Sequence, residues 1–301
     1  MSAGEESVGE RAYLAWEQGD WAAAGPLLEQ AAAEADDAEA AALWFDAALA
    51  YKFLRDWPRA YELGLKAAAL VERGAGEPAY WNLGIAATAL REWETARDAW
   101  AAFGIELPPG DGDLRINFGM TPIRLEPDGA GEVVWAQRIC PTRAIIRSIP
   151  MVCDRGFGDV ILHDGAPNGE RTVGDRQYPV FDEIQVWQSA DIPTWMVDIS
   201  ADAAGYERLV ELFGTQEYGI EASNNVKPVC SCCSKGSVEQ HVEQAQTVDM
   251  LEFWVAAPEE TVLSTLDAWE SEAPDVRAFA NLTLVIAEEE EEEEQEETSA
   301  E

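Results

Sequence analysis

The dipeptides Asp20-Trp21, Asp56-Trp57 and Glu92-Trp93 recur every 36 residues, and alanine follows each tryptophan three positions later. A fixed period of about 20 to 50 residues is typical of stacked supersecondary units. Other positions keep the same spacing, namely Val8, Trp44 and Tyr80; Ala12, Ala48 and Gly84; and Leu28, Gly64 and Trp100. The pattern predicts three helical hairpins over residues 5–107, in which the tryptophans begin the second helices and cover the hairpin ends.

These units resemble the tetratricopeptide repeat family, whose pattern is W-x2-L-G-x2-Y, then A-x3-F-x2-A, then P. The likeness is carried by Tyr80, Leu83, Gly84, Ala96, Trp100 and Pro108 in the third unit and by Trp44, Tyr51, Ala60 and Ala67 in the second. The chain departs from the family in its longer spacing and in Phe103, where a small residue is expected. The resemblance covers about a third of the chain. It implies a binding scaffold rather than an enzyme.

The resemblance also implies which residues face the concave groove of the helical array. They are Tyr13 and Trp16 in the first unit, Phe45, Leu49, Lys52 and Phe53 in the second, and Trp81, Ile85 and Thr88 in the third. Most of these side chains are large and apolar, so we expect a groove that binds an apolar peptide or helix of a partner protein. The competing interpretation is that the C-terminal region folds back onto this face.

A proline- and glycine-rich segment at residues 108–113 ends the helical pattern. Alternating apolar residues then predict an antiparallel, barrel-like β unit over residues 113–190. Its strands are expected at residues 116–125, 133–139, 144–149, 157–163 and 184–187. We expect a hairpin turn at Pro127-Asp128-Gly129, with Gly129 in the positive-φ conformation, and a second turn over residues 164–169.

Residues 191–287 read as strand, helix, strand, repeated once, which is the order of a ferredoxin-like sandwich. Ser200 is expected to cap the first helix, with Tyr206, Leu209, Val210 and Phe213 on its buried face. The second helix is expected to bury Val262, Leu263, Leu266 and Trp269. Residues 288–301 contain ten acidic residues and no large apolar one, and they are predicted to be disordered. The fold class is thus an α+β multidomain chain with N-terminal helical repeats.

The charge of the chain limits its partners. Asp and Glu number 58 against 20 Lys and Arg, for a net charge of −38. Such a field repels nucleic acid and anionic membranes and speeds encounter with a basic protein. It also suits solubility in a salty cytoplasm. The N-terminal sequence has no secretory signal and no apolar run reaches membrane-spanning length, so we expect a cytoplasmic protein of bacterial type.

One cysteine cluster has metal-binding chemistry. Cys230 and Cys233 have the C-x2-C spacing of a zinc knuckle, and His241 follows. A fourth ligand, Cys153 or Cys140, would have to come from a distant segment. Structural zinc, incidental loop thiols and a redox pair all remain open, and no other cofactor is expected.

No catalytic constellation is predicted. His163-Asp164 is the nearest approach to an acid/base pair, but neighbouring residues on a strand point to opposite faces. The sequence therefore favours a non-enzymatic interaction scaffold. The alternatives are an acidic inhibitor, immunity protein or chaperone of a basic partner, and a zinc-dependent enzyme that uses Cys230, Cys233 and His241.

Overall fold

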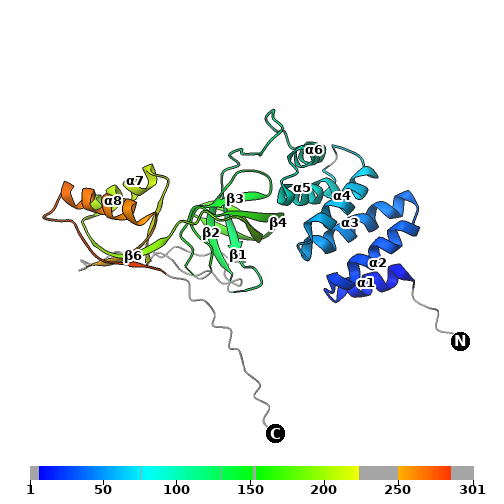
Figure 1. Ribbon diagram of the computed structural model, residues 1–301, viewed down its shortest axis with the longest axis horizontal. Coiled ribbons are helices and arrows are strands. Elements are labelled where there is room, and N and C mark those ends of the chain that lie inside the picture. Colours follow the sequence, from blue (N-terminus) through cyan, green and yellow to red (C-terminus); the bar gives the residue numbers. More distant parts are fainter. Residues whose placement is uncertain (1–6, 75, 130, 152–153, 224–249, 286–301) are drawn as a thin grey trace, which may run out of the picture.

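The computed structural model describes residues 7–74, 76–129, 131–151, 154–223 and 250–285. Helices make up its N-terminal part and two sheets dominate its C-terminal part (Figure 1). The β-barrel lies between the helical array and a sheet covered by two helices. None of the helices in these ranges is both long and apolar enough to cross a membrane.

The N-terminal part consists of six helices that pack in sequence order. They are α1 (Val8–Glu17), α2 (Trp21–Glu34), α3 (Asp37–Phe53), α4 (Trp57–Ala69), α5 (Pro78–Leu90) and α6 (Trp93–Phe103). The acid before each repeated tryptophan is the N-cap residue of a second helix. The Asp20 carboxylate accepts from the Ala23 amide at 3.0 Å, and that of Asp56 accepts from the Arg59 amide at 3.1 Å. In the first two units the recurring dipeptide is therefore a capping signal as well as a packing signal, whereas the Glu92 side chain makes no cap hydrogen bond.

The turn before each cap needs a left-handed residue. Gly19, Arg55 and Arg91 occupy equivalent positions in the three units, with φ values of 71°, 58° and 64°. Gly19 adopts this conformation without steric cost. For Arg55 and Arg91 the same backbone conformation is unfavourable, because each has a Cβ atom.

The size of the buried residues varies between the units in a compensating way. The third unit has Gly84 where the first has Ala12, and Trp100 where the first has Leu28. A Cβ atom at Gly84 would lie only 2.6 Å from the Trp100 ring. The missing side chain on one helix makes room for the largest side chain on the other.

Five strands form a closed barrel in the order β1-β2-β3-β4-β5. They are β1 (Met120–Leu125), β2 (Glu132–Arg138), β3 (Arg143–Ile146), β4 (Val160–Val173) and β5 (Arg176–Gln188). Neighbours are antiparallel, except that β5 closes onto β1 in parallel. The barrel interior is filled by Ile123, Leu125, Val134, Ala136, Ala144, Ile146, Ile161 and Phe181.

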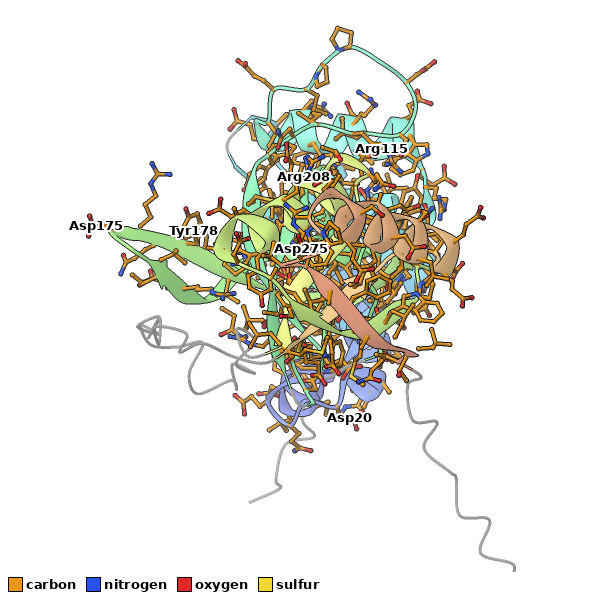
Figure 2. All side chains as sticks on the ribbon, turned by 90° about the vertical axis from the view of Figure 1, so that its left-hand side faces the viewer. Asp20, Arg115, Asp175, Tyr178, Arg208 and Asp275 are labelled. Atoms are coloured by element: carbon orange, nitrogen blue, oxygen red, sulfur yellow. The ribbon has the colours of Figure 1, made fainter. Side chains whose placement is uncertain are left out.

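The barrel corrects two expectations. Residues 164–169 are not a turn: β4 runs through them, with register shifts against β5 that absorb the irregular sequence. The resulting long hairpin extends from the body, with Asp175 at its tip (Figure 2). In the β1–β2 turn the positive φ falls at Glu126 (45°) and Gly131 (61°), not at Gly129.

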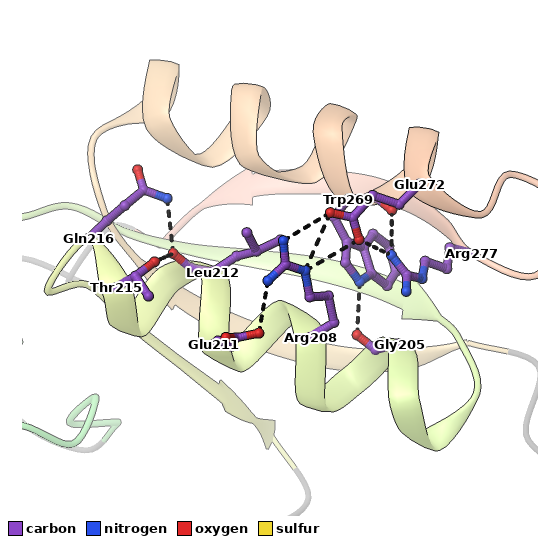
Figure 3. Close-up of polar contacts among 9 residues, drawn as sticks. All are labelled: Gly205, Arg208, Glu211, Leu212, Thr215, Gln216, Trp269, Glu272 and Arg277. Atoms are coloured by element: carbon purple, nitrogen blue, oxygen red, sulfur yellow. Dashed lines mark hydrogen bonds and ion pairs between the residues drawn. The ribbon is translucent and has the colours of Figure 1, made fainter.

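The last unit places two helices against one face of a four-stranded sheet. Its elements are β6 (Thr194–Ser200), α7 (Ala203–Thr215), β7 (Gly219–Ala222), β8 (Leu251–Ala256), α8 (Glu259–Glu272) and β9 (Ala278–Leu284). The strand order is β7-β8-β6-β9 and every neighbouring pair is antiparallel. Figure 3 shows the polar contacts of α7 and α8, where the Trp269 indole donates to the Gly205 carbonyl at 2.8 Å and Arg208 pairs with Glu272.

Three details of this unit differ from expectation. Asp202, not Ser200, caps α7, because Ser200 still belongs to β6. Val210 and Leu263 were expected on the buried faces of their helices but are exposed. A sheet covers only a narrow stripe of a helix, and both residues lie at the margin of that stripe.

Candidate functional site

The barrel covers the hairpin ends of the second and third helical units. Trp57 and Trp93, which begin α4 and α6, join a hydrophobic core shared with Ile139, Val160 and Trp187 of the barrel. The C-terminal region thus packs onto the hairpin ends of these two units.

Hydrogen bonds fix the same contact. The Trp57 indole donates to Gln185 Oε1 at 2.9 Å, and the Trp187 indole donates to the Thr88 carbonyl at 3.1 Å. The Arg91 guanidinium lies 3.8 Å from the Trp187 ring centroid. Because both partners contribute aromatic rings and satisfied indole groups, the array and the barrel are joined by a packed interface.

Several residues assigned to an open groove are therefore covered. Ile85 is fully buried, Thr88 is 1% exposed and Lys52 is 7% exposed. Trp81 is half-buried, and its indole lies directly against Gly165 of β4, where there is no room for a side chain. The chain itself therefore fills the third-unit part of the predicted groove. The sequence could not predict this, because repeat register alone carries no information about what packs on that face.

Lys52 is engaged within this interface. Its ammonium lies 2.8 Å from Asp164 of β4 and donates to Asn82 Oδ1 at 3.0 Å. Burial alone would raise the pKa of Asp164, but the charge and hydrogen bond of Lys52, together with the amides of Ala166 and Gly165, lower it below its usual value. The one cation predicted in the groove is therefore paired with a carboxylate of the barrel.

The first-unit end of the groove is not covered in this way. Three rings, Trp16, Trp21 and Phe53, pack together there, and Tyr13 lies one turn before Trp16 on α1; we call these four residues the aromatic patch. The Trp16 and Trp21 centroids are 4.9 Å apart with near-perpendicular rings, and Trp21 and Phe53 are 4.7 Å apart. Tyr13 is 41% exposed and Phe53 is 44% exposed. Phe45 and Leu49, the remaining predicted groove residues, are half-buried on α3.

The repeat register relates this patch to the barrel interface. Trp16 is equivalent to Lys52 and Thr88, and Trp21 is equivalent to Trp57 and Trp93. The second and third units use these positions to hold the barrel. In the first unit the same positions carry two half-buried tryptophans. Sequence reasoning placed Trp21 at the hairpin end, but not in the patch with Trp16 and Phe53.

A residue that sequence reasoning missed lies beside the patch. The Tyr13 hydroxyl donates to Asp46 Oδ2 on α3 at 2.8 Å. Burial raises the pKa of Asp46, although the Tyr13 hydrogen bond partly opposes the rise. Burial and the Asp46 carboxylate raise the pKa of Tyr13 to about 12. Within the described ranges Asp46 forms no ion pair, and its position in the repeat, equivalent to Asn82, was the available signal.

A pocket of about 380 Å³ separates the C-terminal end of α3 from the barrel. Its lining consists of Lys52, Phe53, Arg55, Pro127, Asp128, Asp164, Ala166, Pro167, Asn168, Asp182, Glu183 and Ile184. Phe53 belongs both to the pocket and to the aromatic patch, so the two meet at this side chain.

Most charges in the pocket wall are compensated. Asp182 pairs with Arg124 and accepts from Asn168 Nδ2 at 2.7 Å. Glu183 pairs with Arg155, whose Nε lies 2.8 Å away. Among the lining residues, Arg55 and Asp128 form no ion pair with any residue in the described part of the chain. The pocket therefore offers one cation and one carboxylate to a ligand, on an otherwise neutralised wall.

The predicted zinc ligands Cys230, Cys233, His241 and Cys153 lie outside the residues that the structure describes. Cys140 is a buried free thiol that accepts from Arg143 Nε at 3.3 Å. In the ranges that the structure describes, no three His, Cys, Asp or Glu side chains are grouped to hold a metal ion.

His163 and Asp164 diverge, as the strand geometry predicts. His163 is fully buried and its ring centroid is 5.3 Å from that of Phe181, which lies in the barrel interior, while Asp164 faces Lys52. Comparisons of the chain with protein-family models, with curated proteins and with solved structures found no match. The candidate site therefore rests on its own geometry.

Proposed function

We propose that this protein is a non-enzymatic interaction scaffold that binds an apolar peptide or helix of a partner protein at the aromatic patch. The observation that carries the proposal is the equivalence of the three hairpin ends. Two of them hold the barrel through a packed aromatic interface, and the first presents Trp16 and Trp21 at the same positions. Solvent-facing rings gathered in this way are typical of binding surfaces.

The finer fold assignments belong to this proposal. We infer that the helical hairpins form a tetratricopeptide-like array, which is supported by the 36-residue register of caps and left-handed turns. The strand order and helix placement of residues 194–284 support a ferredoxin-like sandwich. Both layouts serve many functions, so the function is argued from the patch and not from the fold. We place the scaffold in the cytoplasm on the sequence grounds given above.

The test is site-specific photo-crosslinking in the native host. A photoreactive phenylalanine analogue at position 53 is expected to yield a defined protein adduct, which mass spectrometry identifies. The matched control carries the analogue at exposed Val276, between α8 and β9, and should yield no such adduct. Adding Trp16→Ala should remove the adduct, because truncating a central aromatic anchor costs about 2 kcal/mol, or roughly 30-fold in affinity.

A second candidate is an acidic inhibitor, immunity protein or chaperone that captures a basic partner, and the net charge of −38 favours it. Salt separates the candidates. An apolar contact at the patch should survive about 0.5 M salt, whereas capture by diffuse charge should not. An adduct at position 53 that disappears at high salt in parallel with adducts elsewhere on the protein would favour the second candidate.

The zinc-dependent alternative rests on Cys230, Cys233 and His241. Elemental analysis of the purified full chain tests it. The alternative is supported if the wild-type chain contains one zinc ion and the Cys230→Ser, Cys233→Ser double variant contains none. It is contradicted if the purified wild-type chain contains no zinc.

A further inference from the structure

We propose that the first-unit groove selects a basic segment of its partner, with a Lys or Arg side chain that pairs with Asp46 and lies against Trp16 and Tyr13. The inference rests on the proposed function, because it specifies the chemistry of the partner that the aromatic patch binds. Its physical basis is a comparison of the charged and polar side chains at equivalent positions of neighbouring repeats.

The barrel shows what the array does at the next step along the groove. There Lys52 lies between Asn82 of α5 and Asp164 of the barrel, with contacts of 3.0 Å and 2.8 Å. A cation of the array is thus matched by an anion of the occupant. The occupant, in this case the barrel, supplies the compensating charge.

Between the first and second units, where α1 faces α3, the polarity is reversed. Asp46 takes the place of Asn82, and Trp16 takes the place of Lys52. The Asp46 carboxylate is half-buried, and its hydrogen bond comes from Tyr13, a neutral hydroxyl. A partially desolvated carboxylate gains most from a cation that reaches it from outside. The Tyr13 ring, whose hydroxyl contacts the carboxylate, and the Trp16 ring one turn further along α1 favour the same cation, because aromatic faces attract guanidinium and ammonium groups.

The wider electrostatics agree with this choice. The chain carries −38, so a basic segment is drawn toward it and an acidic segment is repelled. The same field disfavours a second copy of this chain as the occupant. Lys52 and Arg55 are cations of the chain that lie nearby. Lys52 is already paired with Asp164, whereas Arg55, which lines the pocket, would repel a basic segment.

The occupant we infer is therefore an amphipathic basic segment. Its apolar side chains cover the aromatic patch, and one cationic side chain reaches Asp46. Between Asp46 and Phe53, α3 rises by roughly 10 Å, at about 1.5 Å per residue. A helix or strand of a few residues spans that distance, so one segment can occupy the groove and reach the pocket.

The test uses three labelled synthetic peptides of equal length, built from Leu with Lys, Leu with Gln, or Leu with Glu. Fluorescence anisotropy measures their binding to the full chain at about 0.15 M salt. The Leu/Lys peptide should bind most tightly, and Asp46→Asn should weaken it about tenfold while leaving the Leu/Gln peptide within twofold. The matched control is Asp275→Asn, which makes the same charge change at an exposed site on the last unit (Figure 2) and should have less than a twofold effect.

Each outcome decides something. Equal losses in the Asp46 and Asp275 variants would mean that only net charge is read, and would overturn the inference. Equal binding of the Leu/Lys and Leu/Gln peptides, with both lost on Trp16→Ala, would overturn the inference but leave the proposed function standing. If none of the three peptides binds, or if Trp16→Ala does not change their binding, both the inference and the proposed function are contradicted. Dimerisation that depends on Asp46, measured by light scattering, would identify a second copy as the occupant and also overturn the inference.

Discussion

Two groups with opposite effects, the buried His163 and the half-buried Glu221, should shape the pH dependence of barrel stability. His163 is fully buried, and burial together with the Arg138 charge lowers its pKa from 6.5 to about 3. The unfolded chain therefore binds an extra proton at pH values between these two. The contribution of His163 is fully present above about pH 6.5 and is lost as the pH falls toward 3, by about 1.4 kcal/mol per pH unit.

Glu221 acts in the other direction. It lies on β7, where its carboxylate accepts from the Ile149 amide of the barrel at 3.2 Å. Burial raises its pKa from 4.5 to about 7, and the Glu132 charge adds to the rise, while Ile149, Ser148 and Arg171 oppose it. Its contribution is full below about pH 4.5 and is lost as the pH rises toward 7, again by about 1.4 kcal/mol per unit.

The two slopes should cancel between about pH 4.5 and 6.5. The wild-type protein is then expected to show nearly constant stability in that window. In His163→Gln only the Glu221 slope remains, so the free energy of unfolding should fall by roughly 2 to 3 kcal/mol as the pH rises across it. In Glu221→Gln only the His163 slope remains, and the free energy should rise by a similar amount.

Urea denaturation read by hydrogen exchange of β3, β4 and β5 peptides measures these slopes within the barrel. The His163→Gln, Glu221→Gln double variant is the control and should again be flat. A Glu221→Gln protein whose stability does not change between pH 4.5 and 6.5 would refute the description of His163 as a neutral, buried imidazole. A double variant with a steep slope would show that other groups dominate.

Three further predictions concern the helical array and are checked by thermal denaturation. Arg55→Gly should raise the Tm, since it relieves a left-handed backbone conformation that costs a non-glycine residue about 1 kcal/mol. Arg91→Gly should raise the Tm less, because it also loses the stacking of Arg91 on Trp187. Equal increases in the two variants would contradict this role of Trp187. Gly84→Ala should destabilise by about 1 to 3 kcal/mol through its clash with Trp100, and adding Trp100→Leu, which copies the first unit, should restore part of the loss; an undiminished Tm in the single variant would argue against the close contact. Trp187→Ala should cost about 3 to 5 kcal/mol and separate the melting of array and barrel, and a single unchanged transition would contradict the shared core.

Local signals in the sequence predicted much of the array. Asp20 and Asp56 are N-caps, and a cap acts within a few residues of its own position, so a single repeat suffices to recognise it. The alternation of apolar residues likewise identified the β region and the following α+β unit. The ends of elements were less well predicted, because the extension of β4 through residues 164–169 depends on bulges against β5.

The candidate site was only partly predictable, because its limits are set by contacts between distant segments. Nothing near Ile85 or Thr88 in the sequence indicates that the barrel will cover them. The missing side chain at Gly165, 84 positions beyond Trp81, is what lets the two units meet. Asp46 could have been found by comparing it with Asn82 one repeat later, since a change from amide to carboxylate at equivalent positions changes the charge of the groove.

Because the barrel contacts two neighbouring hairpin ends at once, it holds the second and third units together. Any bending between α4 and α5 would have to break contacts of the barrel with both units, among them the indole hydrogen bonds of Trp57 and Trp187. The angle between these two units is therefore fixed by a part of the chain that lies outside the repeats.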